Sequence, residues 1–165
     1  MKLIIKITAL IIFLFGAISC APIPKPFTQI APGISLPPDE VNSRLKLSTI
    51  QGITELKIRN LLNLDLVNIS NTPIGFPSDF GVRVFIEEQN QWTEIKNIFG
   101  YASGNNIVVP LQFDKIADTI VPIYPVVTSS TQPAKIRVIV IGIVYQNSEP
   151  TSIKTAAFID LVLQP

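Results

Sequence analysis

Two pairs of carboxylates are the first side chains whose spacing could do chemistry. Glu87 and Glu88 are adjacent, and facing carboxyl groups can act as a general acid and base. In the β-strand expected there, however, neighbouring side chains point to opposite faces, so these two cannot act as a couple. Asp114 and Asp118 flank an expected loop and could hold Ca²⁺ weakly, but two ligands fall short of the six to eight that this ion prefers. We interpret the aspartates as part of a solvated loop and expect no metal.

The residue types and motifs of the sequence give little indication of nucleophilic catalysis or cofactor binding. Histidine is absent from the 165 residues, which excludes a Ser-His-Asp triad, a Cys-His pair and histidine-based metal sites. The phosphate-binding glycine–lysine loop and the dinucleotide glycine fingerprint do not occur. Ser43 and Lys46 have the Ser-x-x-Lys spacing of penicillin-recognising enzymes, but those enzymes need two further motifs and a larger mixed domain. We expect a non-catalytic protein without a cofactor.

Cys20 is the only cysteine, and the residues before it have the features of an export signal. Lys2 and Lys6 form a short positive segment, and residues 7–18 are an apolar or nearly apolar run. Such a run spans about 18 Å as a helix, which is short of the roughly 30 Å hydrocarbon core of a bilayer. The length is typical of a signal peptide and argues against a permanent membrane span.

The run ends in Ala17-Ile18-Ser19-Cys20, which resembles the lipobox of bacterial lipoproteins. This resemblance implies cleavage before Cys20, which would become the new amino terminus and carry acyl chains such as palmitate. Ala17 stands where leucine is most usual, and Ile18 where a smaller residue is preferred. An ordinary secretory signal is the alternative, because Ala17-x-Ser19 also fits a conventional cleavage site. Two or three acyl chains are enough for stable anchoring, so the expected location is the extracytoplasmic side of the cell membrane or outer membrane.

The charge of the mature chain does not indicate nucleic-acid binding. Removal of Lys2 and Lys6 from 13 basic residues leaves 11, against 12 acidic ones, for a net charge of −1. The remaining basic residues are scattered rather than clustered, whereas nucleic-acid binding relies on a basic patch or stripe. We expect the membrane, and an envelope protein bound to the domain, as partners instead.

Residues 21–38 contain six prolines, which predicts an extended tether. Proline lacks the backbone donor that helices and sheets use and favours polyproline II geometry. At about 3.1 Å per residue, such a tether would hold a domain roughly 50 Å from the bilayer. The sequence thus predicts three parts: a cleaved signal peptide at 1–19, a lipidated cysteine and tether at 20–43, and one folded domain at 44–165.

From about Arg44 the pattern is one strand after another. Apolar residues alternate with less apolar ones at 62–67 and 82–87, and Gln89-Asn90 can turn the second of these strands into a hairpin with residues 92–96. Residues 68–77 have the composition of a loop. Further strands are expected at 107–113, 119–127, 135–145 and 153–163.

This succession predicts an all-β fold, an antiparallel sandwich of about seven to eight strands. In strand count and size it resembles the immunoglobulin-like and fibronectin-like sandwiches, over about 120 residues. That architecture hosts many functions, so it implies a fold and not an activity. We expect the domain to bind another protein or to assist assembly in the cell envelope.

The strand at 135–145 is apolar on both faces. Ile139, Ile141 and Ile143 point away from the face that carries Ile136 and Val138. Such a strand should be central in its sheet and covered on both sides. Either another segment, such as residues 45–60, packs over the second face, or these isoleucines form an exposed stripe on which a partner docks.

Trp92 is the other residue with two interpretations. If Gln89-Asn90 forms the turn, Glu87 pairs with Trp92 and Phe85 pairs with Glu94, so Phe85 and Trp92 share one sheet face. An exposed aromatic pair could bind a carbohydrate or another small ligand, which is our alternative function. The structural interpretation is that Trp92 closes one edge of the sandwich.

Overall fold

The computed structural model describes residues 26–77, 79–98, 109–111, 119–127 and 132–165. The predicted signal peptide, Cys20 and the two aspartates Asp114 and Asp118 lie outside these ranges. The described chain is all-β, with two single-turn 3₁₀ helices, η1 (Pro38–Glu40) and η2 (Ile50–Gly52). The strands are β1 (Thr28–Ala31), β2 (Ile34–Leu36), β3 (Leu45–Thr49), β4 (Glu55–Lys57), β5 (Leu62–Asn68), β6 (Ile74–Phe76), β7 (Arg83–Glu88), β8 (Gln91–Ile95), β9 (Val109–Leu111), β10 (Thr119–Ile123), β11 (Ala134–Gln146) and β12 (Glu149–Gln164).

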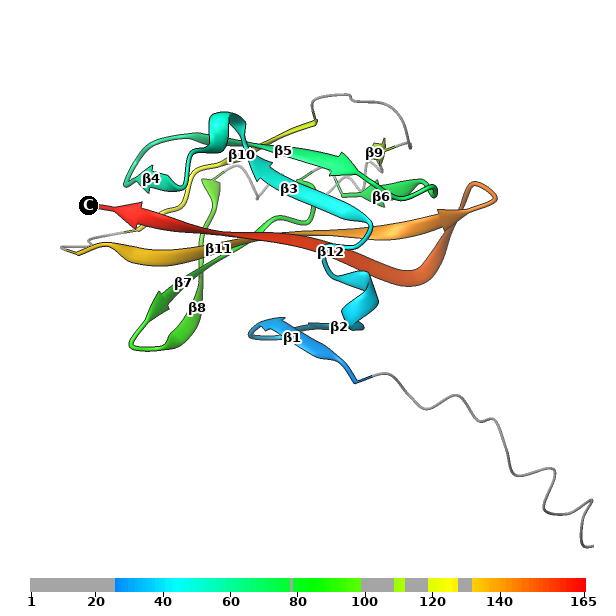
Figure 1. Ribbon diagram of the computed structural model, residues 1–165, viewed down its shortest axis with the longest axis horizontal. Coiled ribbons are helices and arrows are strands. Elements are labelled where there is room, and N and C mark those ends of the chain that lie inside the picture. Colours follow the sequence, from blue (N-terminus) through cyan, green and yellow to red (C-terminus); the bar gives the residue numbers. More distant parts are fainter. Residues whose placement is uncertain (1–25, 78, 99–108, 112–118, 128–131) are drawn as a thin grey trace, which may run out of the picture.

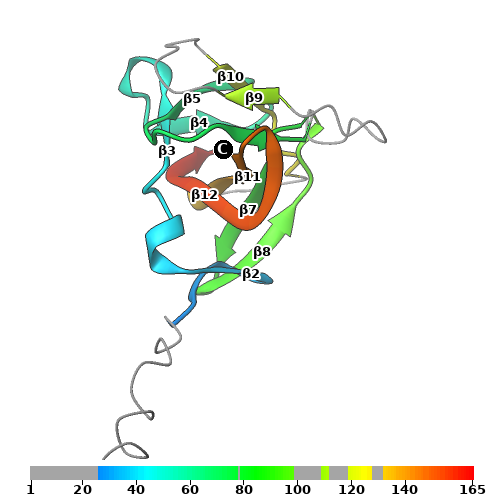
Figure 2. The ribbon, with the colours of Figure 1, turned by 90° about the vertical axis from the view of Figure 1, so that its right-hand side faces the viewer.

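Two sheets form the sandwich that the sequence predicts. The larger sheet has the order β4-β12-β11-β6-β9, and β11 also pairs with β7, which pairs with β8. The smaller sheet has the order β10-β5-β3. Neighbouring strands are antiparallel except for β4 and β12, which run parallel. Figure 1 shows the small sheet lying over one face of the large one, and Figure 2 shows the same layers end on.

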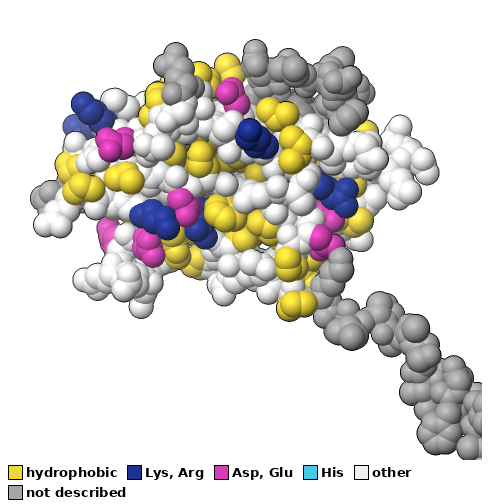
Figure 3. Space-filling model, viewed as in Figure 1, with side chains coloured by type: hydrophobic (Ala, Val, Ile, Leu, Met, Phe, Trp, Pro, Cys, Tyr) yellow, Lys and Arg dark blue, Asp and Glu magenta, His cyan; other side chains and the backbone are white. Residues whose placement is uncertain are grey.

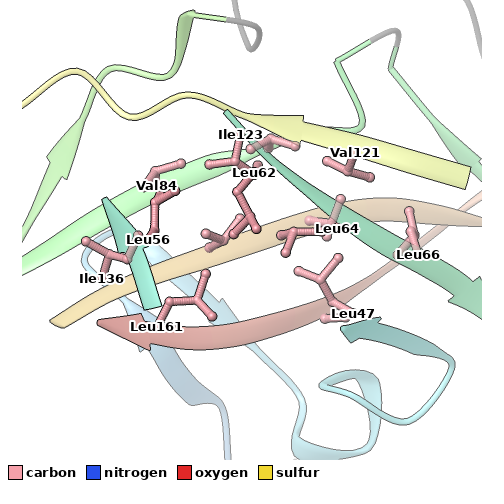
Figure 4. Close-up of a cluster of buried hydrophobic side chains, with 14 of the residues drawn as sticks. Leu47, Leu56, Leu62, Leu64, Leu66, Val84, Val121, Ile123, Ile136 and Leu161 are labelled. Carbon is pink, nitrogen blue, oxygen red and sulfur yellow. The ribbon is translucent and has the colours of Figure 1, made fainter. Parts of the chain in front are cut away.

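The main core fills the space between the two sheets. Leu62, Leu64 and Leu66 of β5 are buried while the residues between them are partly exposed, which confirms the alternation expected at 62–67. They face the even-numbered side chains of β11, such as Ile136 and Val138, which are fully buried (Figure 4). A continuous apolar layer of this kind is the dominant favourable contribution to folding.

The β7–β8 hairpin has the predicted register. Gln89 and Asn90 have φ values of 51° and 62°, the left-handed conformation that a tight two-residue hairpin turn requires. Glu87 pairs with Trp92 and Phe85 pairs with Glu94, as expected. The loop expected at 68–77 is wrong in one part, because β6 lies within it and pairs with β11 and β9.

A third layer covers the opposite face of the large sheet. β1 and β2 form a hairpin whose apolar side chains pack against Phe85, Ile139 and Ala156 of the sheet. In Figures 1 and 2 this hairpin lies on the side of the large sheet away from β3, β5 and β10. The extended tether predicted for this stretch is therefore wrong from Thr28 to Leu36.

The reason for that difference is the turn at Pro32-Gly33. Proline is favoured at the second position of a type II turn, and the third position needs a positive φ that glycine adopts without strain. Gly33 has a φ of 71°. The prolines in this stretch therefore direct a chain reversal as well as extension, and the apolar residues on either side of the turn gain a surface to pack on.

The connection from the hairpin to β3 is fixed to β12. The backbone N–H of Asn42 donates to the Ala156 carbonyl at 2.8 Å, and the Asn42 side chain accepts from the Phe158 N–H at 2.9 Å. The hydroxyl of Thr155 donates to the Glu40 carbonyl at 3.0 Å. These bonds hold the third layer in place along the middle of β12.

Candidate functional site

The residues predicted to form an interaction surface share one face of β7, β8 and β11, and the β1–β2 hairpin lies on that face. Phe85 and Ile139 are fully buried beneath β1 and β2. Trp92, Ile141 and Ile143 are half-buried. The predicted stripe of exposed isoleucines is therefore wrong at Ile139, and the predicted exposed aromatic pair is wrong at Phe85, because the hairpin at 28–36 covers both residues. Residues 45–60 do not cover this face, since β3 lies in the small sheet and β4 pairs with the edge of β12.

Arg137 is at the centre of the polar part of this face. Its guanidinium carbon lies 4.8 Å from the ring centroid of Trp92 and 4.4 Å from that of Phe158, so the cation is in contact with two aromatic rings. Its Nε and Nη2 donate to the two carboxylate oxygens of Asp160 at 2.6 and 2.7 Å. Its Nη1 donates to the Ile30 carbonyl at 2.7 Å, which connects β11 to the hairpin.

The electrostatic environment of this cluster keeps both Arg137 and Asp160 charged. The hydrogen bond from Asp160 raises the pKa of Arg137 further above its usual value, against a smaller opposing effect of burial. Burial alone would raise the pKa of Asp160, but the hydrogen bonds and charges of Arg137 and Lys135 outweigh it and lower that pKa. Lys135 Nζ lies 3.2 Å from Asp160 Oδ2 and 5.5 Å from the Trp92 ring centroid. We call these five residues, Trp92, Lys135, Arg137, Phe158 and Asp160, the Arg137 cluster.

A hollow of about 270 Å³ adjoins this cluster. Trp92 and Arg137 form one side of it, and the hairpin residues from Gln29 to Pro32 form the other. A half-buried indole beside a guanidinium offers an apolar surface and hydrogen-bond donors, the combination found where small polar ligands are held. Trp92 thus fills the space between the hairpin and the sheet and also lines a cavity that opens to solvent.

A larger groove, of about 540 Å³, lies where the described chain begins. Phe27, Leu36, Pro37 and Ile153 supply its apolar lining, and Asp39, Glu40 and Lys154 supply charged groups. The Glu40 carboxylate accepts two hydrogen bonds from Arg44, at 2.7 and 2.9 Å, so its charge is compensated. The sequence carries no local signal for this groove, because its residues are far apart in the chain and meet only when the hairpin packs beside β12.

A third hollow, of about 190 Å³, contains a buried amide. Asn97 is 3% exposed, and its Oδ1 accepts a hydrogen bond from the Tyr124 N–H at 2.7 Å. Its Nδ2 is buried without a hydrogen-bond partner in the structure. Arg83 and Glu94, which form an ion pair, line the same hollow. A buried amide donor in a polar hollow of this size is a typical site for an ordered water molecule.

Metal-ligating side chains do not gather within the described ranges, where no group of three or more cysteine, aspartate or glutamate residues could hold an ion. None of the helices in that part of the chain has the length and hydropathy needed to cross a bilayer. Comparisons of the sequence with protein-family models and with curated proteins find no match.

Proposed function

We propose that the chain is an exported lipoprotein, anchored through acyl chains on Cys20, that presents its sandwich in the cell envelope for contact with another protein or for envelope assembly. The observation that carries this proposal is the position of the only cysteine, directly after an apolar run of signal-peptide length and the residues Ala17-Ile18-Ser19. A thiol at that position is consumed by lipidation, whereas a free one would be an exposed reactive group outside the cytoplasm.

The fold is compatible with this arrangement. β1 begins at Thr28, so the folded domain starts shortly after the proposed anchor. The three layers bury their facing apolar sides against one another, so a partner would dock on the outer surfaces, edges and loops that remain. In this proposal the domain acts by binding and not by catalysis.

Intact-mass analysis of the mature protein from its own membrane tests the anchor. We expect a chain that starts at Cys20 with a mass increment of two or three acyl chains. A conventional secretory protein would also begin near Cys20, but its sulfur would be unmodified and it would be recovered without detergent. The Cys20→Ser variant is the matched control, because it removes the acylation site and leaves Ala17-x-Ser19 intact.

The hollow beside Trp92 favours a second candidate, a module that binds a carbohydrate or another small polar ligand. Since Trp92 is the only tryptophan, its fluorescence reports on this hollow alone. Titration with a panel of soluble glycans should change the emission in a saturable way if the hollow is a binding site. An emission spectrum unchanged across the panel, with folded protein at each step, removes carbohydrate as the ligand class.

A further inference from the structure

The groove at Phe27 has exposed apolar side chains and begins seven residues after the proposed anchor in the chain. Phe27 is 69% exposed and Ile153 is 41% exposed, and both line the groove together with Leu36 and Pro37. In Figure 3, hydrophobic side chains gather at the corner where the described chain begins. Exposed apolar side chains that line one groove offer a surface for an apolar partner.

The length of chain between Cys20 and Phe27 limits how far this groove can lie from the membrane. Six residues, 21–26, separate them. A fully extended chain advances at most about 3.6 Å per residue, so the Cα atom of Phe27 lies within about 25 Å of the Cα atom of Cys20. This limit is about half the separation that a tether through residue 38 would allow, because the hairpin takes up residues 28–36.

We propose that the groove formed by Phe27, Leu36, Pro37 and Ile153 rests on the bilayer that holds the anchor, with the two exposed side chains in the headgroup layer. This inference rests on the proposed acylation of Cys20. One anchor and one apolar contact would together fix the orientation of the domain. β1 and β2 then face the lipid, while the small sheet faces away from it.

The charges around the groove indicate which lipid surface it fits. Lys154 and Asp39 line the groove with opposite charges, and Lys154 can pair with a lipid phosphate. Glu40 is compensated by Arg44 and adds little net charge. The lining is therefore close to neutral, which suits zwitterionic headgroups better than a strongly anionic surface, since the latter favours clusters of basic residues.

Spin labelling of the acylated full chain in phosphatidylethanolamine–phosphatidylcholine vesicles tests the contact. Because Cys20 is the only cysteine and its sulfur is acylated in the proposed protein, a cysteine introduced elsewhere can be labelled alone. The test variants are Phe27→Cys and Ile153→Cys. The matched controls are Leu61→Cys and Ile120→Cys, which replace residues 51% and 47% exposed on the small-sheet side of the molecule.

The readout is the collision rate of each nitroxide with oxygen, which concentrates in the bilayer, and with a water-soluble nickel complex, which is excluded from it. At 27 and 153 we expect nickel collisions several-fold lower, and oxygen collisions higher, than at the two control positions. Nickel and oxygen collisions that are both low would place a protein, or another part of this chain, over the groove and overturn the proposal. Collisions equal to those at the controls would show an uncovered groove and also overturn it.

The anchor is tested on the same samples by intact mass. If the protein is acylated but its groove is uncovered, the proposed bilayer contact is wrong and the lipoprotein proposal still holds. Protein that takes up label at Cys20 and lacks acyl chains overturns both, so the two failures are distinguishable.

Discussion

Arg137 and Asp160 face each other across β11 and β12 and are joined by two hydrogen bonds. Their alignment depends on a bulge in β12, where residues 151–153 lie opposite Val144 alone. In the register next to the turn, where Gln146 pairs with Glu149, Arg137 would be opposite Phe158. The bulge moves it by two residues, so that its guanidinium pairs with Asp160 while still contacting the Phe158 ring.

The first prediction concerns the stability that this pair contributes. Arg137→Gln should lower the free energy of unfolding by about 2 kcal/mol, because it removes the paired hydrogen bonds to the partly buried Asp160 and leaves the Ile30 carbonyl without its side-chain donor. Urea denaturation measures the change. The control is Arg83→Gln, which removes a similar two-pronged ion pair with Glu94 from a more exposed position and should cost less than about 1 kcal/mol. Equal effects of the two substitutions would contradict the central role of Arg137.

A second prediction follows from the lowered pKa of Asp160. When the folded pKa of a carboxyl lies below its unfolded value, the unfolded state binds more protons between the two values, so stability rises with pH there. The stabilisation is thus present above the ordinary pKa of 3.8 and is lost as the pH falls through the folded value. The raised pKa of Arg137 adds no dependence at acid pH, because that group is charged in both states.

The measurement is the urea midpoint from pH 6 down to pH 3. Wild-type protein should lose stability below about pH 5. Asp160→Asn should be less stable than the wild type at neutral pH but should lose less stability over the acid range. Glu94, whose pKa is lowered by its hydrogen bond with Arg83, gives a smaller contribution of the same sign because it is more exposed. Parallel curves for the wild type and Asp160→Asn would show that this pair does not contribute to the acid sensitivity.

The third prediction compares two glycines that are needed for different reasons. Gly33 has a positive φ, and a Cβ there would meet nothing within 4 Å, so Gly33→Ala should cost only backbone strain, about 1 kcal/mol. At Gly142 a Cβ would lie 2.5 Å from Ile74 Cγ2 and 2.8 Å from Phe76 Cε1. Gly142→Ala should therefore cost more, about 2–3 kcal/mol, because the buried side chains of Ile74 and Phe76 must shift to make room. Thermal unfolding of both variants measures the order, and a reversed order would contradict this interpretation of the packing.

Local signals explain the parts of the fold that could be predicted from the sequence. The alternation of Leu62, Leu64 and Leu66 places their strand and its buried face, and the turn at Gln89-Asn90 sets the register that puts Trp92 opposite Glu87. These features depend on residues close together in the chain, so the period of the pattern and the chemistry of the turn are sufficient to define them.

The Arg137 cluster depends on contacts that no local pattern reveals. Arg137 and the Ile30 carbonyl are 107 residues apart in the chain. The Pro32-Gly33 pair could have indicated a hairpin, but which sheet face it covers is decided by the apolar side chains around Ile139 and not by the turn. The two extra residues of the bulge in β12 shift the register, and without them the pairing of Arg137 with Asp160 cannot be derived.

The fourth prediction tests whether the hairpin belongs to the folded domain. A shortened chain of residues 44–165, the domain boundary that the sequence predicts, lacks β1 and β2 and so leaves Phe85, Ile139 and Ala156 facing water. We expect it to bind the dye ANS strongly and to show a red-shifted Trp92 emission, because the indole loses its cover as well. A chain of residues 26–165 is the matched control and should do neither.

The double variant Ile30→Ser/Ile34→Ser keeps the full length and should show the same changes to a smaller degree, since it weakens the apolar contact that holds the hairpin on the sheet. If the 44–165 chain unfolds cooperatively, with the ANS binding and emission of the control, then the third layer is dispensable and the face beneath it is stable in water.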